Sequence, residues 1–388
     1  MISHDNYKIE FVGARKESYS EDSRNPSIEM GSFMDDMLRR DFTINTLALS
    51  LNTKTFGNLI DTFDGINDLE KGVITTPTEP DKTFIDDPLR MLRAVRFACQ
   101  LDFQIDKNTT KSIIKNSDRI NILSSERIAD EINKILMTKT PSNGFKNLEK
   151  LKILDYIIPE LIDLKGVEEV EGQTHKDNFY HTLEVVDNIS SKTDNLWLRW
   201  AALLHDIGKS PTKKFNKKIG WTFHGHEHVG SKMVKKIFTR LKLPLNDTMK
   251  YVQKIVMMSS RPIIIAEDIV TDSAVRRLIY DAGDSIDDLL TLCEADITTK
   301  NERKFEKYHN NFKIVREKIK IVEEKDNIRN FQPPVTGEII MKHFKIGPCK
   351  EIGIIKDEIK NAILDGEIKN NYKSAFNLMK IKGKSLGL

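Results

Sequence analysis

The chain has 388 residues, of which 39% are hydrophobic and 31% are charged, and its formal net charge is only +3. This composition is typical of a soluble protein of two or three domains and excludes a uniformly basic surface for nucleic acid. With three scattered cysteines and no apolar run of membrane-spanning length, we expect no disulfide framework, no membrane span and a reducing, cytoplasmic location.

Residues 8–14 are predicted to form a strand in which Glu10 is an acidic residue among mostly apolar neighbours. A solvent-facing edge position is the simpler interpretation of Glu10. The alternative is a carboxylate presented to a divalent metal, because Mg²⁺ prefers hard oxygen ligands on a rigid support. Residues 16–37 are mostly polar and include Pro26 and Gly31, so we predict a loop there.

A doubled arginine and an aspartate open the segment of residues 39–45, Arg-Arg-Asp-Phe-Thr-Ile-Asn. Residues 43–51 are apolar enough for a buried helix or a strand, and periodicity does not decide between them. Further on, residues 68–72 predict a helical turn that ends on glycine, and residues 73–75 predict a short strand. We expect the prolines at 77 and 80 to interrupt regular structure.

From Asp86 onward the pattern becomes helical, with apolar residues on one side and three arginines, Arg90, Arg93 and Arg96, on the other. An arginine stripe is usually a solvated face. Asp87, however, precedes Arg90 by about one turn, which places an acceptor beside a bidentate donor. Such a pair matches the hydrogen-bonding edge of a base. An intrahelical salt bridge fits the same spacing.

Six of the nine histidines fall between His175 and His228. His181 begins a predicted helix, an apolar helix leads into His205-Asp206, and a His-x-His-x-His run follows at 224–228. Imidazole and carboxylate groups together suit a borderline divalent ion. Surface histidines that bind nothing are the alternative.

The carboxyl-terminal third is predicted to be helical. Residues 304–326 predict a long helix with charges of both signs, and residues 332–338 predict a hinge. Lysines recur near the end of the sequence, which fits either a solvated tail or a contact with RNA phosphates.

Taken in order, these segments resemble the bacterial class II tRNA nucleotidyltransferases, the CCA-adding enzymes, some of which carry an HD domain. The motifs with this resemblance are residues 39–45, 61–65, 83–98 and 125–136, followed by the histidine block. The resemblance implies a mainly α protein. It predicts a partial polymerase-β-type α/β head at 1–60, a helical neck at 61–165, an HD domain at 166–300 and a helical, tRNA-contacting tail at 301–388.

The resemblance also implies site residues. Asp87 and Arg90 are expected to read the base of CTP or ATP, Arg40 and Asp41 to contact the ribose, and residues 61–65 to give the head flexibility. Arg93 and Arg96 are included in the nucleotide site, and Glu10 falls on the position of a catalytic strand carboxylate that serves Mg²⁺. At the HD site, a mononuclear divalent metal on His181, His205, Asp206 and Asp296 is favoured over a two-metal site.

One part of the family pattern is missing. The sequence contains no Gly-Gly pair and no Asp-x-Asp, which hold the phosphates and metals in the family head. A misplaced start codon, a split or decayed gene and a separate head polypeptide each account for this. We expect these 388 residues to be inactive in nucleotide transfer on their own. The competing functions are an HD-type phosphohydrolase acting on 2′,3′-cyclic phosphates or nucleotides, and a non-catalytic tRNA-binding protein.

Overall fold

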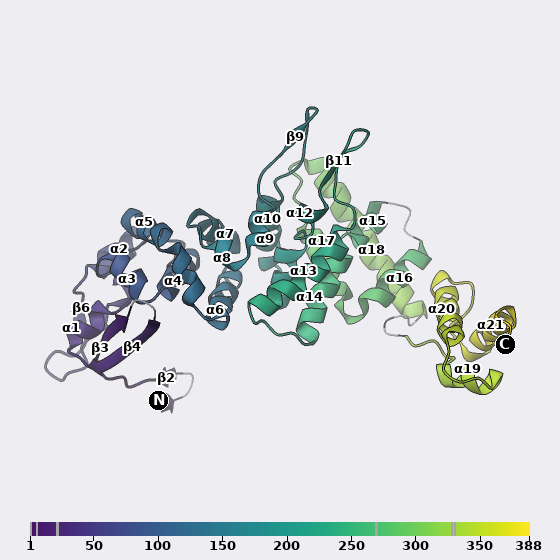
Figure 1. Cartoon of the computed structure of the whole chain (residues 1–388), viewed down its shortest axis with the longest axis horizontal. Coiled ribbons are helices and arrows are strands. Elements are labelled where there is room, and N and C mark those ends of the chain that lie inside the picture. The colour runs from purple at the N-terminus through teal and green to yellow at the C-terminus, as the bar shows by residue number, and fades with distance from the viewer. Residues whose placement is uncertain (1, 5–6, 21–22, 268–270, 327–328, 330) are drawn as a thin grey trace. The chain divides into compact units, whose positions relative to one another are not determined.

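The computed structural model describes residues 2–4, 7–20, 23–267, 271–326, 329 and 331–388, which fall into two compact units, residues 1–250 and 251–388. Helices dominate both units, and each sheet among the described residues has only two strands. The prediction of a mainly α protein is therefore confirmed (Figure 1). Among the described residues, no helix is both long and apolar enough to cross a membrane.

The first unit begins with short strands. They are β1 (Ile2–His4), β2 (Tyr7–Ile9), β3 (Arg15–Ser20), β4 (Ser23–Met30), β5 (Ala48–Leu49) and β6 (Leu59–Ile60), with the helix α1 (Phe33–Leu38) and the 3₁₀ turn η1 (Thr43–Asn45) between β4 and β5. The strand expected at 8–14 is wrong beyond Ile9, and the loop expected at 16–37 is wrong because β3 and β4 form an antiparallel hairpin. Backbone pairing between polar residues builds this ribbon, so it leaves no apolar pattern in the sequence.

The middle of the first unit is helical. Its elements are α2 (Gly65–Lys71), β7 (Val73–Ile74), α3 (Pro80–Asp86), α4 (Leu89–Leu101), β8 (Gln104–Ile105), α5 (Lys107–Lys115), η2 (Ser117–Ile122), α6 (Ser125–Leu136), α7 (Pro141–Lys150), α8 (Leu154–Ile157) and α9 (Pro159–Ile162). As predicted, α2 ends on Gly72 in the left-handed conformation, and β7 is a strand. Pro80 does not interrupt a helix. It begins α3, since the first helical position needs no amide donor.

Helix α4 carries the core of this region. Its apolar side chains are buried against α6 and α7, and they include Met91, Leu92, Ala94, Val95 and Ala98. The predicted solvated stripe of arginines is found only at Arg93, since Arg90 is buried and Arg96 reaches Glu131 of α6.

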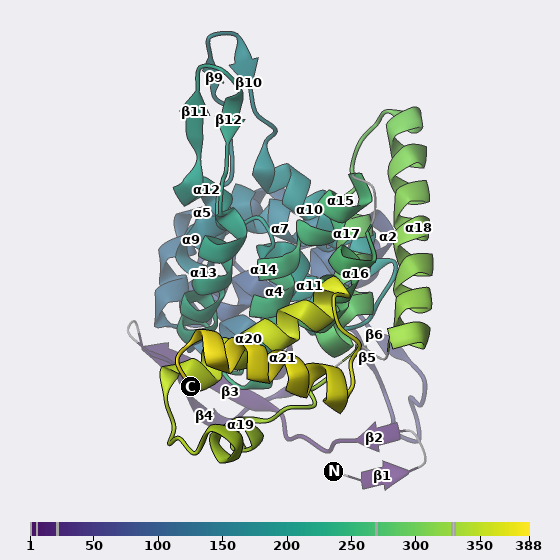
Figure 2. The same ribbon diagram turned by 90° about the vertical axis from the view of Figure 1, so that its right-hand side faces the viewer.

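The rest of the first unit contains β9 (Glu169–Val170), β10 (Gln173–Thr174), α10 (Asn178–Ser190), α11 (Leu196–Leu204), α12 (Lys209–Thr212), β11 (Lys214–Asn216), β12 (Gly220–Thr222) and α13 (His226–Arg240). Strands β9 and β10 form one hairpin and strands β11 and β12 form another, and the two hairpins lie side by side (Figures 1 and 2). His175 packs edge-on against Trp221, with 5.1 Å between the ring centroids. Arg199 of α11 is buried and donates hydrogen bonds to the carbonyls of Leu136, Thr138, Ser190 and Thr193. This side chain therefore fixes α11 against the end of α6 and the end of α10.

Among its described residues, the second unit contains helices and connecting segments but no strand. Helix α14 (Asp247–Met258) crosses the boundary, and it is followed by α15 (Arg261–Glu267), α16 (Asp272–Ala282), η3 (Gly283–Ser285), α17 (Ile286–Ala295), α18 (Glu302–Asp326), α19 (Gly337–Phe344), α20 (Lys350–Asp365) and α21 (Tyr372–Ser385). The long charged helix expected at 304–326 is confirmed as α18, which packs on α15 and α16. The four-part domain division remains a prediction.

Candidate nucleotide pocket and histidine cluster

A polar cavity of about 400 Å³ lies between the segment after α1 and the start of α4. The residues lining it are Arg39, Arg40, Asp41, Asn45, Asp87, Arg90, Arg93 and Phe97. Two segments that lie about fifty residues apart in the sequence thus meet at one cavity. Five of the six residues predicted to bind a nucleotide are among its lining, and Arg96 is not.

Asp41 organises the loop side of the cavity and is buried. Its Oδ1 accepts hydrogen bonds from the Phe42 amide at 3.0 Å and from Asn45 Nδ2 at 2.9 Å, and its Oδ2 accepts from Arg93 Nε at 2.6 Å. Arg40 adds a bond from Nη1 to the Asn45 carbonyl at 3.0 Å. The 3₁₀ turn at 43–45 is therefore held to α4 through a single carboxylate.

Arg90 and Asp87 do not form the intrahelical salt bridge that their spacing allowed. The buried Arg90 donates from Nη2 to the carbonyl of Arg39 at 2.5 Å, and Asp87 Oδ1 accepts from the Leu89 amide at 3.1 Å. The Asp87 carboxylate thus caps the start of α4 and also lines the cavity, where its other oxygen can accept from a ligand.

Arg96 points to the other side of α4. Its Nε lies 2.8 Å from Oε2 of Glu131, a residue of α6 that is only 2% exposed, and its guanidinium lies 4.2 Å from the centroid of the Phe97 ring. Arg93 lies over the same ring at 5.2 Å. Arg96 therefore supports the Phe97 wall of the cavity from outside the cavity.

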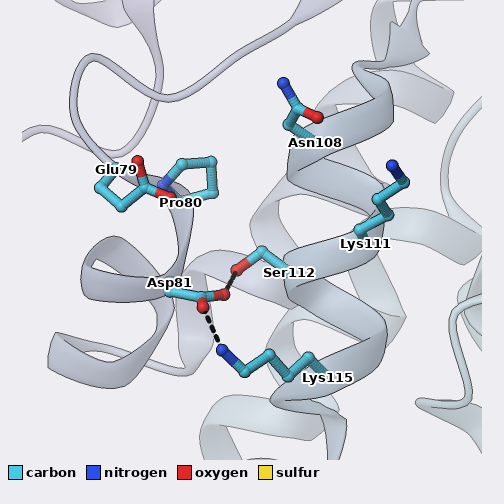
Figure 3. Close-up of a pocket in the computed structure, with 7 residues that line it drawn as sticks. All are labelled: Glu79, Pro80, Asp81, Asn108, Lys111, Ser112 and Lys115. Carbon is cyan, nitrogen blue, oxygen red and sulfur yellow. Dashed lines mark hydrogen bonds and ion pairs between the residues drawn. The ribbon is translucent and has the colours of Figure 1, made fainter.

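A second cavity, of about 290 Å³, lies between α3 and α5, and none of its lining residues was predicted as a site residue. Figure 3 shows Asp81 of α3 turned toward Ser112 and Lys115 of α5, and both side chains donate to its carboxylate. The hydrogen bond from Lys115 is the main reason that the pKa of Asp81 lies below its usual value. This contact fixes α3, and α3 ends next to Asp87.

Glu10 lies just beyond β2, is exposed and belongs to no strand. The expectation that a strand presents its carboxylate is therefore wrong, because strand pairing ends at Ile9. Its assignment as a catalytic group remains a prediction.

The predicted histidine–aspartate site is formed around a buried carboxylate. Asp206 is 3% exposed, and its Oδ2 lies 3.4 Å from His205 Nε2, 3.7 Å from His181 Nε2 and 2.6 Å from Lys209 Nζ. Burial alone would raise the pKa of Asp206, but the charges of His205 and Lys209 hold it well below its usual value. The carboxylate is thus favoured in its charged form, with the Lys209 ammonium already beside it.

His226, the first residue of α13, completes this cluster, with Nε2 at 3.7 Å from Asp206 Oδ1. Its position depends on Gly208, since a Cβ there would overlap the backbone of His226 and Gly230. His226 is not among the four ligands that the resemblance implies, and its signal in the sequence is the His-x-His-x-His run at 224–228. Asp296 follows α17 in the second unit, and its role as a ligand remains a prediction.

Three family models match the chain. "Poly A polymerase head domain" matches residues 1–75, "Probable RNA and SrmB-binding site of polymerase A" matches 102–164 and "HD domain" matches 178–301. The cavity is lined by residues 39–45 of the first segment and by residues 87–97, which fall between the first and second segments. The histidine cluster lies in the third segment. Fold and matches therefore define a protein with a polymerase-type head segment, an RNA-binding segment and an HD domain.

The chain combines these three segments and is similar in sequence to bacterial CCA-adding enzymes. It is 32% identical over 270 residues to the A-adding tRNA nucleotidyltransferase of Deinococcus radiodurans, which covers 68% of this chain and 59% of that protein. It is 35% identical over 217 residues to the multifunctional CCA protein of Shewanella frigidimarina, covering 54% and 50%. The chain thus spans between half and three fifths of the length of these relatives.

Solved structures share the fold. The Bacillus stearothermophilus CCA-adding enzyme in complex with CTP matches with a TM-score of 0.61 and 20% identity, over 97% of this chain and 79% of that one. The Thermotoga maritima CCA-adding enzyme complexed with tRNA matches with a TM-score of 0.51 and 21% identity, over 91% and 74%.

Proposed function

We propose that the chain acts in CCA addition, the transfer of CMP and AMP to the 3′ end of tRNA. The observation that supports this most strongly is the cavity that gathers Arg40, Asp41, Asp87, Arg90 and Arg93. A carboxylate acceptor beside guanidinium donors can pair with the exocyclic amine and ring nitrogen of cytosine or adenine, and both bases share this pattern. Guanine and uracil present the opposite pattern, so the protein itself selects the nucleotide.

Each residue has a distinct part in this proposal. Asp87 accepts from the exocyclic amine, the arginines of α4 donate to the base, and Arg40 and Asp41 position the ribose. Mg²⁺ would stabilise the charge that develops as the tRNA 3′-hydroxyl displaces pyrophosphate from the α-phosphate. We assign residues 1–60 to the head, 61–165 to the neck, 166–300 to the HD domain and 301–388 to a tail that contacts tRNA, in a cytoplasmic protein.

The test is equilibrium binding of CTP, ATP, GTP and UTP to the purified chain by calorimetry. Selective binding of CTP and ATP supports the proposal. Equal binding of all four nucleotides, or of none, contradicts it.

Transfer is a separate question, because the sequence contains neither Gly-Gly nor Asp-x-Asp. We propose that the two metal-holding carboxylates come from further sequence or from a separate head polypeptide. The purified 388 residues should then bind CTP without adding it to tRNA that lacks its CCA end. Robust CMP incorporation by this chain alone would overturn that proposal.

A second candidate function rests on the histidine cluster. His205, His226 and His181 surround Asp206, and imidazole with carboxylate suits a borderline divalent ion. The proposed activity is metal-dependent hydrolysis of a 2′,3′-cyclic phosphate. Asp206→Ala should abolish hydrolysis of 2′,3′-cyclic AMP without changing CTP binding. Hydrolysis that survives in this variant would contradict the assignment.

A further inference from the structure

The imidazoles around Asp206 differ in their hydrogen bonds. His205 Nδ1 lies 2.7 Å from the Ala202 carbonyl, and His226 Nδ1 lies 2.9 Å from the Phe223 carbonyl. A carbonyl only accepts, so in each neutral ring the proton is on Nδ1 and Nε2 presents a lone pair. This is the usual arrangement of a metal-binding histidine, in which the outer nitrogen donates to a backbone or carboxylate oxygen.

His181 has the reverse arrangement. Its Nδ1 lies 2.6 Å from the ammonium of Lys176, and an ammonium only donates. The Nδ1 lone pair is therefore the acceptor, and the proton of the neutral ring lies on Nε2. That nitrogen is 3.7 Å from Asp206 Oδ2.

We propose that Lys176 is a positioning residue that sets the tautomer of His181 and opposes metal binding by this ring. The proposal rests on the second candidate function. Ligation through Nε2 requires the proton to move to Nδ1, where the ammonium already donates. Ligation through Nδ1 requires the ammonium to leave. By either route the ammonium of Lys176 must move away from His181 Nδ1. Without metal, the cluster is therefore held in a state that offers two imidazoles as ligands, those of His205 and His226, rather than three.

The local structure makes Lys176 a suitable residue for such a role. It is exposed and lies just before Asp177, whose side chain caps α10 by accepting from the amides of Phe179 and Tyr180. The helix is therefore capped independently of Lys176. Its replacement should leave α10 and the fold intact.

The test compares the wild type with Lys176→Met, and with Lys232→Met, which replaces an exposed lysine of α13, as the matched control. Two readouts are used: the ¹⁵N chemical shifts of the histidine rings without metal, and calorimetric titration with Ni²⁺. We expect the wild-type His181 ring to carry its proton on Nε2 and the rings of His205 and His226 to carry theirs on Nδ1. Lys176→Met should bind Ni²⁺ about tenfold more tightly, the size of effect that outer partners of metal ligands have, while Lys232→Met should match the wild type.

The experiment distinguishes a failure of the proposal for Lys176 from a failure of the metal site itself. A wild-type His181 with its proton on Nδ1, or Ni²⁺ affinity that Lys176→Met leaves unchanged, overturns the role of Lys176. If no variant binds Ni²⁺, the metal site of the second candidate function is wrong, and the ring shifts still decide whether Lys176 sets the tautomer.

Discussion

Arg93 Nε lies 2.6 Å from Asp41 Oδ2, which joins α4 to the segment after α1 across 52 residues of sequence. The pair is asymmetric, because the Asp41 side chain is 9% exposed and that of Arg93 is 32% exposed. Asp41 also holds the 3₁₀ turn through Phe42 and Asn45. The ion pair therefore positions the turn and α4 on opposite sides of one cavity.

This pair should show energetic coupling in a double-mutant cycle. Arg93→Met, Asp41→Asn and the double variant should reveal a coupling of about 1 kcal/mol in urea unfolding, the scale of a partly exposed ion pair. Both single variants should also weaken CTP binding, because both residues line the cavity. Additive unfolding energies would mean that the two side chains do not interact in solution.

Arg199 should be among the most sensitive positions of the first unit. Arg199→Met removes the donor to four carbonyls that lie around a buried guanidinium, and buried acceptors left without partners are costly. We expect a loss of about 3–5 kcal/mol in the free energy of unfolding, measured by urea denaturation. Arg240→Met is the control, since its pair with Glu160 is exposed and should matter by less than about 1 kcal/mol. Equal effects of the two substitutions would contradict the structure.

Gly208→Ala tests the close contact that positions His226. The added methyl group overlaps the backbone of α13, so α13 must shift away from Asp206. We expect destabilisation of about 1–3 kcal/mol, as for overpacked sites, together with weaker Ni²⁺ binding. Gly347→Ala is the control, because that position has open space around its Cα. A Gly208→Ala protein with unchanged stability and Ni²⁺ affinity would show that the contact is absent.

Two aspartates near the cavity should have opposite effects on the pH dependence of stability. Burial raises the pKa of Asp86 above its usual value, so its native form binds a proton more readily than the unfolded chain does. The resulting stability is present at low pH and is lost as pH rises through the raised pKa. Asp86→Asn should therefore stabilise the protein near neutral pH and lose this advantage in acid, measured as urea midpoints across the pH range.

Asp36 supplies the matched comparison. Burial alone would raise its pKa, but the hydrogen bond and charge of Arg39, with the charge of Arg40, lower it. Its stabilising effect is present above the unfolded pKa and is lost as pH falls through the lowered value. Asp36→Asn should thus destabilise near neutral pH, and the difference should shrink in acid. The same sign of change in both variants would contradict the assigned environments.

The sequence predicted elements that an apolar pattern or a helix end defines. The amphipathic helix with Arg90 and Arg93 and the glycine that ends α2 were found in this way. The β3–β4 hairpin was missed because backbone pairing of polar residues leaves no alternating apolar signal. Pro80 was interpreted as an interruption, since composition alone does not distinguish the first position of a helix from its interior.

The sequence predicts which residues form the site, but it does not predict which contacts their side chains make. Asp41, Asp87 and Arg90 were named, yet the bond from Arg90 to the Arg39 carbonyl depends on a tertiary approach that spacing does not encode. Arg96 lies on the same helical stripe but turns toward Glu131, because the buried carboxylate of α6 attracts it. His226 is brought to Asp206 only by the packing of α13 on Gly208.

The central claim is that the cavity around Asp87 reads the base of CTP and ATP. The most direct measurement compares binding of CTP to the wild type, to Asp87→Asn and to Asp118→Asn, an exposed aspartate outside the cavity. Asp87→Asn replaces one acceptor oxygen by an amide donor at constant shape, so it should weaken CTP and ATP binding at least about tenfold, the energy of one good base contact. Asp118→Asn should bind like the wild type. Unchanged CTP affinity in the folded Asp87→Asn protein would contradict the account.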